Sequence, residues 1–111
     1  MTSSKYFVTP SECSTREIFP GVQITAMGGQ QMMISRVDLK PGSVVELHSH
    51  PHEQMGILIE GEMTFTIGEE TRELKKGEMW RIPGNVPHTV TAGPNGALAI
   101  DIFHPVREEY L

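Results

Sequence analysis

The chain has 111 residues, which is enough for one domain with a buried core and too few for two. Its formal net charge of -5 argues against partners that reward a basic surface, such as nucleic acids and acidic membranes. No run approaches the roughly 20 apolar residues that span a bilayer, and residues 1–5 lack the apolar segment of a secretion signal, so we expect a cytoplasmic protein. Cys13 is the only cysteine, which excludes an intrachain disulfide and a thiolate metal cluster.

Short extended runs separated by glycine and proline predict an all-β protein. Helical periodicity is weak almost everywhere, and we expect strands at residues 22–27, 31–39, 44–50, 54–60, 63–67, 71–74, 79–82, 88–91 and 97–103. Turn residues separate these runs at Gly28-Gly29, Pro41-Gly42, Gly61, Gly68, Gly77, Pro83-Gly84-Asn85 and Pro94-Asn95-Gly96. Many short strands of this kind are typical of an antiparallel sandwich or barrel.

Two segments allow more specific predictions about the sheet. In residues 61–77, Met63, Phe65 and Ile67 alternate with polar residues, which predicts a hairpin with one face in the core and its polar second strand at an exposed edge. The Met-rich stretch 30–33 looks like an amino-terminal edge strand. Because sheet edges need protection and isologous dimers are the commonest closed assembly, we expect a homodimer. The alternative is that the methionines fill the core.

Histidines cluster in the extended segment 47–54. Side chains two apart in a strand face the same way, so His48 and His50 can point at one centre. Imidazole suits divalent transition metals. The alternative is that these histidines are solvated loop residues or hydrogen-bonded core residues. Gln54 shares their parity, whereas Glu53 faces the other way in an unbroken strand, although Pro51 can disturb that parity.

The spacing around these histidines resembles the first motif of the cupin superfamily. Gly42 is followed after five residues by His48, then by His50, after three residues by Gln54 and after six by Gly61. The fourth ligand position of this motif usually carries glutamate. An amide there leaves a bound cation its full double positive charge, which strengthens it as a Lewis acid and as a binder of anions.

The second cupin motif follows in register. Gly77 is followed after five residues by Pro83, then by Asn85, where the pattern usually has glycine, and after two more by His88. The resemblance implies a cupin double-stranded β-helix, which is a jelly-roll barrel, in a single domain of residues 1–111 with motif 1 at about 42–61 and motif 2 at about 77–92. It also implies one divalent transition metal, for which Ni, Zn, Mn, Fe and Co are all compatible, held by His48, His50, Gln54 and His88.

The last predicted strand carries a carboxylate on the same face as an aromatic ring. Asp101 and Phe103 share one face of residues 97–103, and aliphatic residues occupy the other. If the aliphatic face packs outward, Asp101 looks into the barrel, where a charged group must meet a cation, hydrogen-bond donors or a substrate. The alternative is a structural ion pair with Arg36 or Arg81.

The run His-Ser-His-Pro-His-Glu-Gln and the terminal Ile-Asp-Ile-Phe-His-Pro-Val-Arg-Glu-Glu-Tyr together resemble the KdgF-type cupins of uronate metabolism, from about residue 33 to the end. This resemblance implies a small anionic sugar-acid substrate and an isomerase-like enzyme that converts 4,5-unsaturated monouronates, released by pectin and alginate lyases, to linear keto sugars. Asp101 is then the general acid and base, and Phe103 an apolar wall against the sugar. Arg107 is a candidate for the substrate carboxylate, with a rim salt bridge to Glu108 or Glu109 as the alternative.

Two rival functions belong to different classes. Cupins with three histidine ligands also activate oxygen at iron or copper, so a dioxygenase acting on a small organic substrate is one rival, against which Gln54 and Asp101 count. A sugar- or metal-sensing module is the other, favoured by the small size and opposed by the lack of a basic surface. We expect His52 to cap the rim of the site or to hydrogen-bond a neighbour, and His104 to lie at the surface or beside the ligands.

Overall fold

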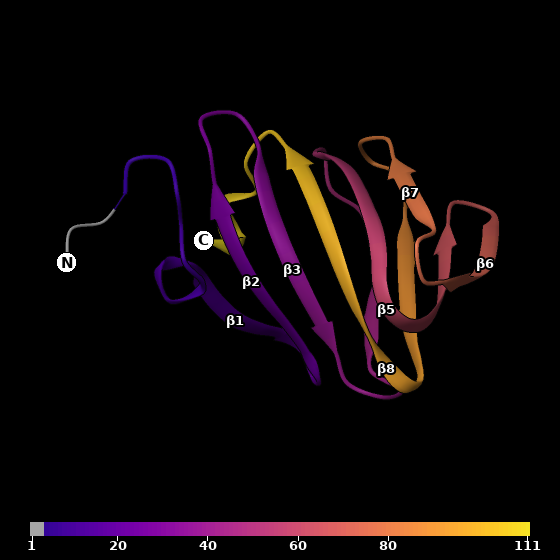
Figure 1. Cartoon of the computed structure of the whole chain (residues 1–111). Coiled ribbons are helices and arrows are strands. Elements are labelled where there is room, and N and C mark those ends of the chain that lie inside the picture. Colours follow the sequence, from indigo (N-terminus) through magenta and orange to yellow (C-terminus); the bar gives the residue numbers. More distant parts are fainter. Residues whose placement is uncertain (1–3) are drawn as a thin grey trace.

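Antiparallel strands make up most of the molecule (Figure 1), whose computed structural model describes residues 4–111. The predicted domain of residues 1–111 thus includes residues 1–3, which lie outside the described range. The strands are β1 (Ser14–Phe19), β2 (Val22–Gly28), β3 (Met33–Leu39), β4 (Val44–His48), β5 (Glu53–Ile67), β6 (Glu70–Lys75), β7 (Met79–Ile82) and β8 (His88–His104), with 3-10 helices η1 (Pro10–Glu12) and η2 (Glu108–Tyr110). The described residues contain no helix of the length and hydropathy that crossing a membrane requires. The predicted all-β fold is confirmed.

Two long strands organise the barrel. β5 and β8 pair antiparallel along most of their lengths (Figure 1). The carboxy-terminal part of β8 also pairs with β3, which continues the sheet through β2 to β1, while the amino-terminal part of β8 pairs with β4. β7 and β6 pair with the first and second parts of β5, respectively. The same two strands therefore take part in both layers, and the predicted jelly roll is confirmed.

The predicted breaks at Gly61 and at residues 94–96 do not end strands. β5 and β8 run through them, and the register shifts between Leu58 and Glu60 and again between Gly61 and Met63. Such bulges bend a strand without ending its pairing. Gly61 has a φ of +84°, and a Cβ there would collide with the carbonyl oxygen of Gly96. These glycines allow close approach of the two strands at the bend, which the sequence pattern alone reads as a turn.

The amino-terminal edge differs from the prediction. β1, which sequence analysis missed because its residues are mostly polar, pairs with β2 and forms the edge of the sheet. β3 lies between β2 and β8, so the prediction of a Met-rich edge strand at residues 30–33 is wrong. Met33 is buried in the core and Met32 is about half exposed. The homodimer stays a prediction, which a molar-mass measurement in solution tests.

Side chains alternate across the strands as the sequence pattern predicts. Ala99 and Phe103 are buried, whereas Ile102 on the opposite face is exposed. In the hairpin of β5 and β6, Met63 and Phe65 are buried and β6 is exposed apart from Leu74, so that prediction is confirmed. The face of β8 that carries Asp101 therefore looks into the space enclosed by the sheets.

Candidate functional site

Three histidines converge from two separated stretches of the chain. His48 ends β4 and lies opposite His88, the first residue of β8, while His50 lies in the loop before β5. The distances between ring centroids are 4.4 Å for His48 and His88, 5.0 Å for His50 and His88, and 5.6 Å for His48 and His50. Potential ligand atoms of the three residues all lie within 4.8 Å of one another. The predicted strand 44–50 ends at His48, so the loop, rather than strand parity, places His50.

The turn after β7 fixes that loop. The backbone N–H of Asn85 donates to the carbonyl oxygen of His50 at 2.7 Å. Asn85 has a φ of +68°, a left-handed conformation that asparagine tolerates better than most residues other than glycine. This explains how asparagine stands where the cupin pattern usually has glycine. The two motifs are thus bonded to each other at the site.

A backbone carbonyl sets the orientation of each imidazole. The Nδ1 atoms of His48, His50 and His88 bond to the carbonyl oxygens of Glu46 at 2.8 Å, His52 at 3.0 Å and Val86 at 2.9 Å, respectively. A neutral imidazole that donates from Nδ1 keeps a free lone pair on Nε2. Burial lowers the pKa of His50, and it lowers the pKa of His88 to about 4. Both rings are therefore neutral at pH 7 and able to bind a metal.

The donor atoms in this cluster fit a cation. Gln54 is buried, and its Oε1 lies 3.1 Å from Nε2 of His50. With the His50 hydrogen on Nδ1, both of these atoms present lone pairs. Nε2 of His88 is also buried and has no hydrogen-bond partner among the described residues. A divalent transition metal satisfies such lone pairs, whereas the same arrangement without one leaves buried acceptors unpaired.

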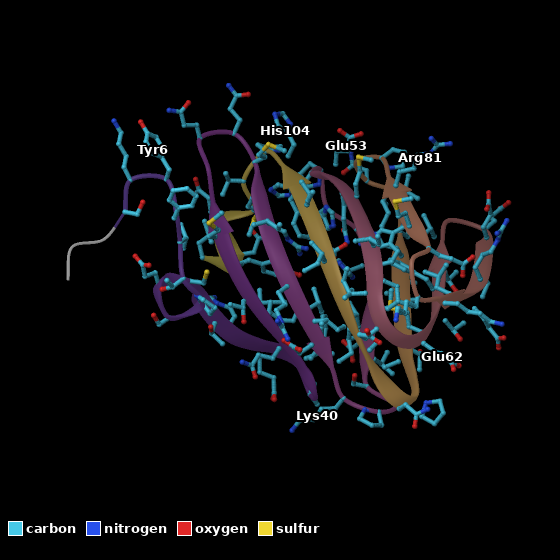
Figure 2. All side chains as sticks on the ribbon, in the orientation of Figure 1. Tyr6, Lys40, Glu53, Glu62, Arg81 and His104 are labelled. Carbon is cyan, nitrogen blue, oxygen red and sulfur yellow. The ribbon has the colours of Figure 1, made fainter. Side chains whose placement is uncertain are left out.

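The other histidines and Glu53 lie at the periphery. Figure 2 shows Glu53 and His104 at the same edge of the sheet, where they are paired in register and exposed. Gln54, and not Glu53, thus faces the histidine cluster. His52 is partly buried, and its carbonyl oxygen supports the ring of His50.

Asp101 lies in a row of residues that crosses the sheet. Ser35 on β3, Gly56 on β5 and Trp80 on β7 are its register neighbours along that row. The indole Nε1 of Trp80 donates to Oδ1 of Asp101 at 2.8 Å. Gly56 lies between these two residues, and a Cβ there would collide with both the indole and the carboxylate. Gly56 therefore makes room for the hydrogen bond that positions Asp101.

Desolvation dominates the electrostatics of Asp101. Burial raises the pKa of this carboxyl group to about 6, against the opposing effects of the Gln54 amide, the Trp80 indole and the Arg107 charge. The alternative of an ion pair with Arg36 or Arg81 is wrong. Arg36 pairs with Asp38 at 3.3 Å, and Arg81 lies exposed at the edge of the sheet (Figure 2). Near neutral pH the carboxyl group can both give and take a proton.

Phe103 and Arg107 form another wall of the same space. The ring of Phe103 is buried with its centroid 5.7 Å from that of His50. The Arg107 guanidinium carbon lies 4.1 Å from the Tyr110 ring centroid, and Nε donates to Oε1 of Glu109 at 2.7 Å. The predicted alternative of a salt bridge is thus present for Glu109. A single cavity is lined by both groups together with the residues His48, Gln54, His88 and Asp101.

Sequence analysis missed several residues that shape this cavity. Trp80 alternates with exposed residues in β7, and Gly56 interrupts an apolar strand. These two patterns were the available signals that the residues pack around Asp101. No local signal reveals Arg16, which donates from β1 to the carbonyl oxygens of Glu109 and Leu111 at 2.9 Å each. Figure 1 shows the carboxy terminus lying beside the amino-terminal strands, where these bonds hold the segment that carries Arg107.

Replacing Trp80 with phenylalanine should raise the pKa of Asp101. The indole hydrogen bond favours the charged carboxylate, so its loss favours the protonated form and raises the pKa of Asp101 above about 6, by roughly one pH unit. Carbon-13 NMR of the Asp101 carboxyl group in metal-free protein measures this pKa. An unchanged or lower value in Trp80→Phe contradicts the assignment. Met79→Leu is the matched control, because Met79 is an exposed neighbour on the same strand.

Comparisons with known proteins agree with this geometry. The chain is 31% identical over 70 residues to the oxalate decarboxylase OxdC of Bacillus subtilis, an alignment that covers 59% of this chain but only 18% of the decarboxylase. It is 28% identical over 110 residues to the pectin degradation protein KdgF of Dickeya dadantii, covering 96% of this chain and 98% of KdgF.

Solved structures show the same fold. The structure of KdgF from Halomonas sp. superposes with a TM-score of 0.85 at 27% identity, covering 95% of this chain and 99% of that one. The family model for the cupin domain matches residues 35–103, which contain His48, Gln54, His88 and Asp101. With this match over more than half of its length, a jelly-roll fold and a three-histidine cluster, the chain belongs to the cupin superfamily, as a metal-binding type.

Proposed function

We propose that this protein is a metal-dependent enzyme that converts a 4,5-unsaturated monouronate to a linear keto sugar. The observation that carries the proposal is one cavity lined by Gln54, by the Asp101 carboxyl group and by His48 and His88, two members of the three-histidine cluster. Similarity to a pectin degradation protein over nearly the whole of both chains supports the substrate class. The cation would be held by His48, His50, Gln54 and His88.

The reaction is an isomerisation, so it needs no oxidant or reductant. The substrate is a cyclic enol ether with a carboxylate on carbon 5. Its anomeric hydroxyl loses a proton, the bond between the anomeric carbon and the ring oxygen breaks, and an aldehyde forms. The enolate that is left, with its oxygen on carbon 5, becomes a ketone when carbon 4 receives a proton. One proton leaves oxygen and one arrives at carbon, which suits a single residue that acts as base and then as acid.

Asp101 is the group proposed to move these protons. With a pKa of about 6, its carboxylate accepts the hydroxyl proton at neutral pH, and the resulting acid delivers a proton to carbon 4. Trp80 keeps one carboxylate oxygen in place during both steps. When bound, a divalent cation supplies positive charge that polarises substrate oxygens and stabilises developing negative charge.

Two further residues orient the sugar. The Arg107 guanidinium is the proposed partner of the substrate carboxylate, because its Nε is bonded to Glu109 and its plane is held by Tyr110 beside the cavity. The buried ring of Phe103 offers an apolar surface for one face of the sugar. Fixed contacts of this kind contribute to catalysis by holding the reacting atoms close together in the productive orientation.

The test supplies metal-loaded protein with the products of a pectin lyase and, separately, of an alginate lyase. We expect the ultraviolet absorbance of the conjugated enol carboxylate to disappear with at least one of them, and the same rate under nitrogen as in air. Rates that depend on oxygen favour a cupin dioxygenase instead. Binding of the uronate without turnover favours the sensor module, and a lack of both contradicts the proposed substrate class.

A further inference from the structure

We propose that Ser35 is a substrate-contacting residue of this cavity, whose hydroxyl donates a hydrogen bond to a sugar oxygen held beside Asp101. The inference rests on the proposed function and adds a residue to it. Three observations carry it: the burial of Ser35, its lack of a hydrogen-bond partner, and its position beside Asp101.

Ser35 is a buried serine on β3 whose hydroxyl does not contribute a hydrogen bond to the described part of the fold. Its residue is 0% exposed, and its Oγ has no hydrogen-bond partner among the described residues. Ser43 provides the contrast, because it is also buried but donates to the carbonyl oxygen of Lys40 at 2.7 Å. A buried hydroxyl without a partner destabilises the folded state, since it gives up its bonds to water and gains none.

The position of Ser35 directs that hydroxyl into the cavity. Ser35 lines the same space as Gln54 and Arg107, and it is the direct register neighbour of Asp101 on the adjacent strand. Residues directly opposite each other in antiparallel strands project from the same face with Cβ atoms roughly 5 Å apart. The hydroxyl and the Asp101 carboxyl group thus project from the same face of neighbouring strands into one cavity.

The described residues around Ser35 offer its hydroxyl no hydrogen-bond partner that would stabilise the fold. Its other register neighbour is Ala26, and Met33 and Val37, two residues away on its own face, are buried and apolar. Asp101 already receives a hydrogen bond from Trp80 and interacts with the amide of Gln54. An alanine would suit this packing better than a serine, so the hydroxyl stays available for a ligand oxygen.

The test compares Ser35→Ala with Ser43→Ala in the metal-loaded protein. Without substrate, Ser35→Ala should raise the melting temperature by roughly 4 °C or more, because it removes an unpaired buried hydroxyl. Ser43→Ala should lower it, because it removes a satisfied one. With the unsaturated uronate, kcat/KM should fall roughly 10-fold in Ser35→Ala and stay unchanged in Ser43→Ala. Metal content should equal that of the wild type in both.

Each outcome decides between structural and substrate-binding roles. A lower melting temperature in Ser35→Ala means that the hydroxyl is bonded in the free protein, which overturns the proposal. A higher melting temperature with unchanged kcat/KM also overturns it, because the hydroxyl then serves neither folding nor substrate. If the wild type turns over neither uronate, the proposed function fails. The melting temperatures alone then show whether Ser35 holds an unpaired donor in the cavity.

Discussion

Replacing Asp101 with alanine should lower kcat for unsaturated uronates by roughly 100- to 10,000-fold, the range that general acid and base catalysis contributes. The bound metal should be unaffected, because the histidine cluster gets its orientation from backbone carbonyls and not from this carboxylate. Steady-state kinetics together with elemental analysis of the purified variant measure the two effects separately.

Asp101→Asn distinguishes proton transfer from positioning. The amide can keep the hydrogen bond from Trp80, but it cannot exchange a proton, so its kcat should be as low as that of the alanine variant. Asp38→Asn is the matched control, because Asp38 is a half-exposed aspartate paired with Arg36 away from the cavity. Substantial activity in Asp101→Asn removes this residue from the proton-transfer steps.

Replacing His88 with alanine should abolish stoichiometric metal binding and turnover together. His88 is the most deeply buried of the three histidines, and its Nε2 has no hydrogen-bond partner in the described part of the chain. This nitrogen is therefore free to bind a cation. Loss of one imidazole should weaken metal binding by more than the roughly 10- to 100-fold that loss of a residue supporting a ligand causes. Calorimetric titration of the metal-free protein measures the affinity.

Melting temperature gives a second readout of the same prediction. A metal that binds only the folded state raises the melting temperature with its concentration, so Ni²⁺ or Mn²⁺ should stabilise the wild type and not His88→Ala. His104→Ala serves as control, because this histidine is exposed at the sheet edge (Figure 2). Wild-type affinity in His88→Ala contradicts the proposed ligand set.

Gln54 connects the two parts of the site and therefore the two predictions. Its Oε1 faces His50, and its amide group also lowers the pKa of Asp101 as a hydrogen-bond partner. An amide can serve both neighbours at once, because it has an acceptor on one side and donors on the other. A glutamate, the usual residue of this motif, would place a second negative charge beside Asp101 and favour its protonated form.

Strand periodicity predicted much of the fold. It failed at two glycine bends inside long strands and at one mostly polar edge strand. Alternation correctly assigned the buried face of the β5–β6 hairpin and the inward face of β8. The bends at Gly61 and Gly96 looked like turns because glycine marks both turns and bulges. β1 was missed because most of its residues are polar and its apolar residues occur only at its end, so it shows no alternating pattern.

The sequence by itself determined the cupin membership and the chemical types of the candidate ligands, because the spacing of histidines and glycines along the chain encodes them. Only the tertiary structure decided which atoms meet. The loop that places His50 is held by Asn85, and the row of Ser35, Gly56 and Trp80 around Asp101 comes from three different strands. These relations depend on register and burial across the sheet, which bring together residues that no local pattern connects.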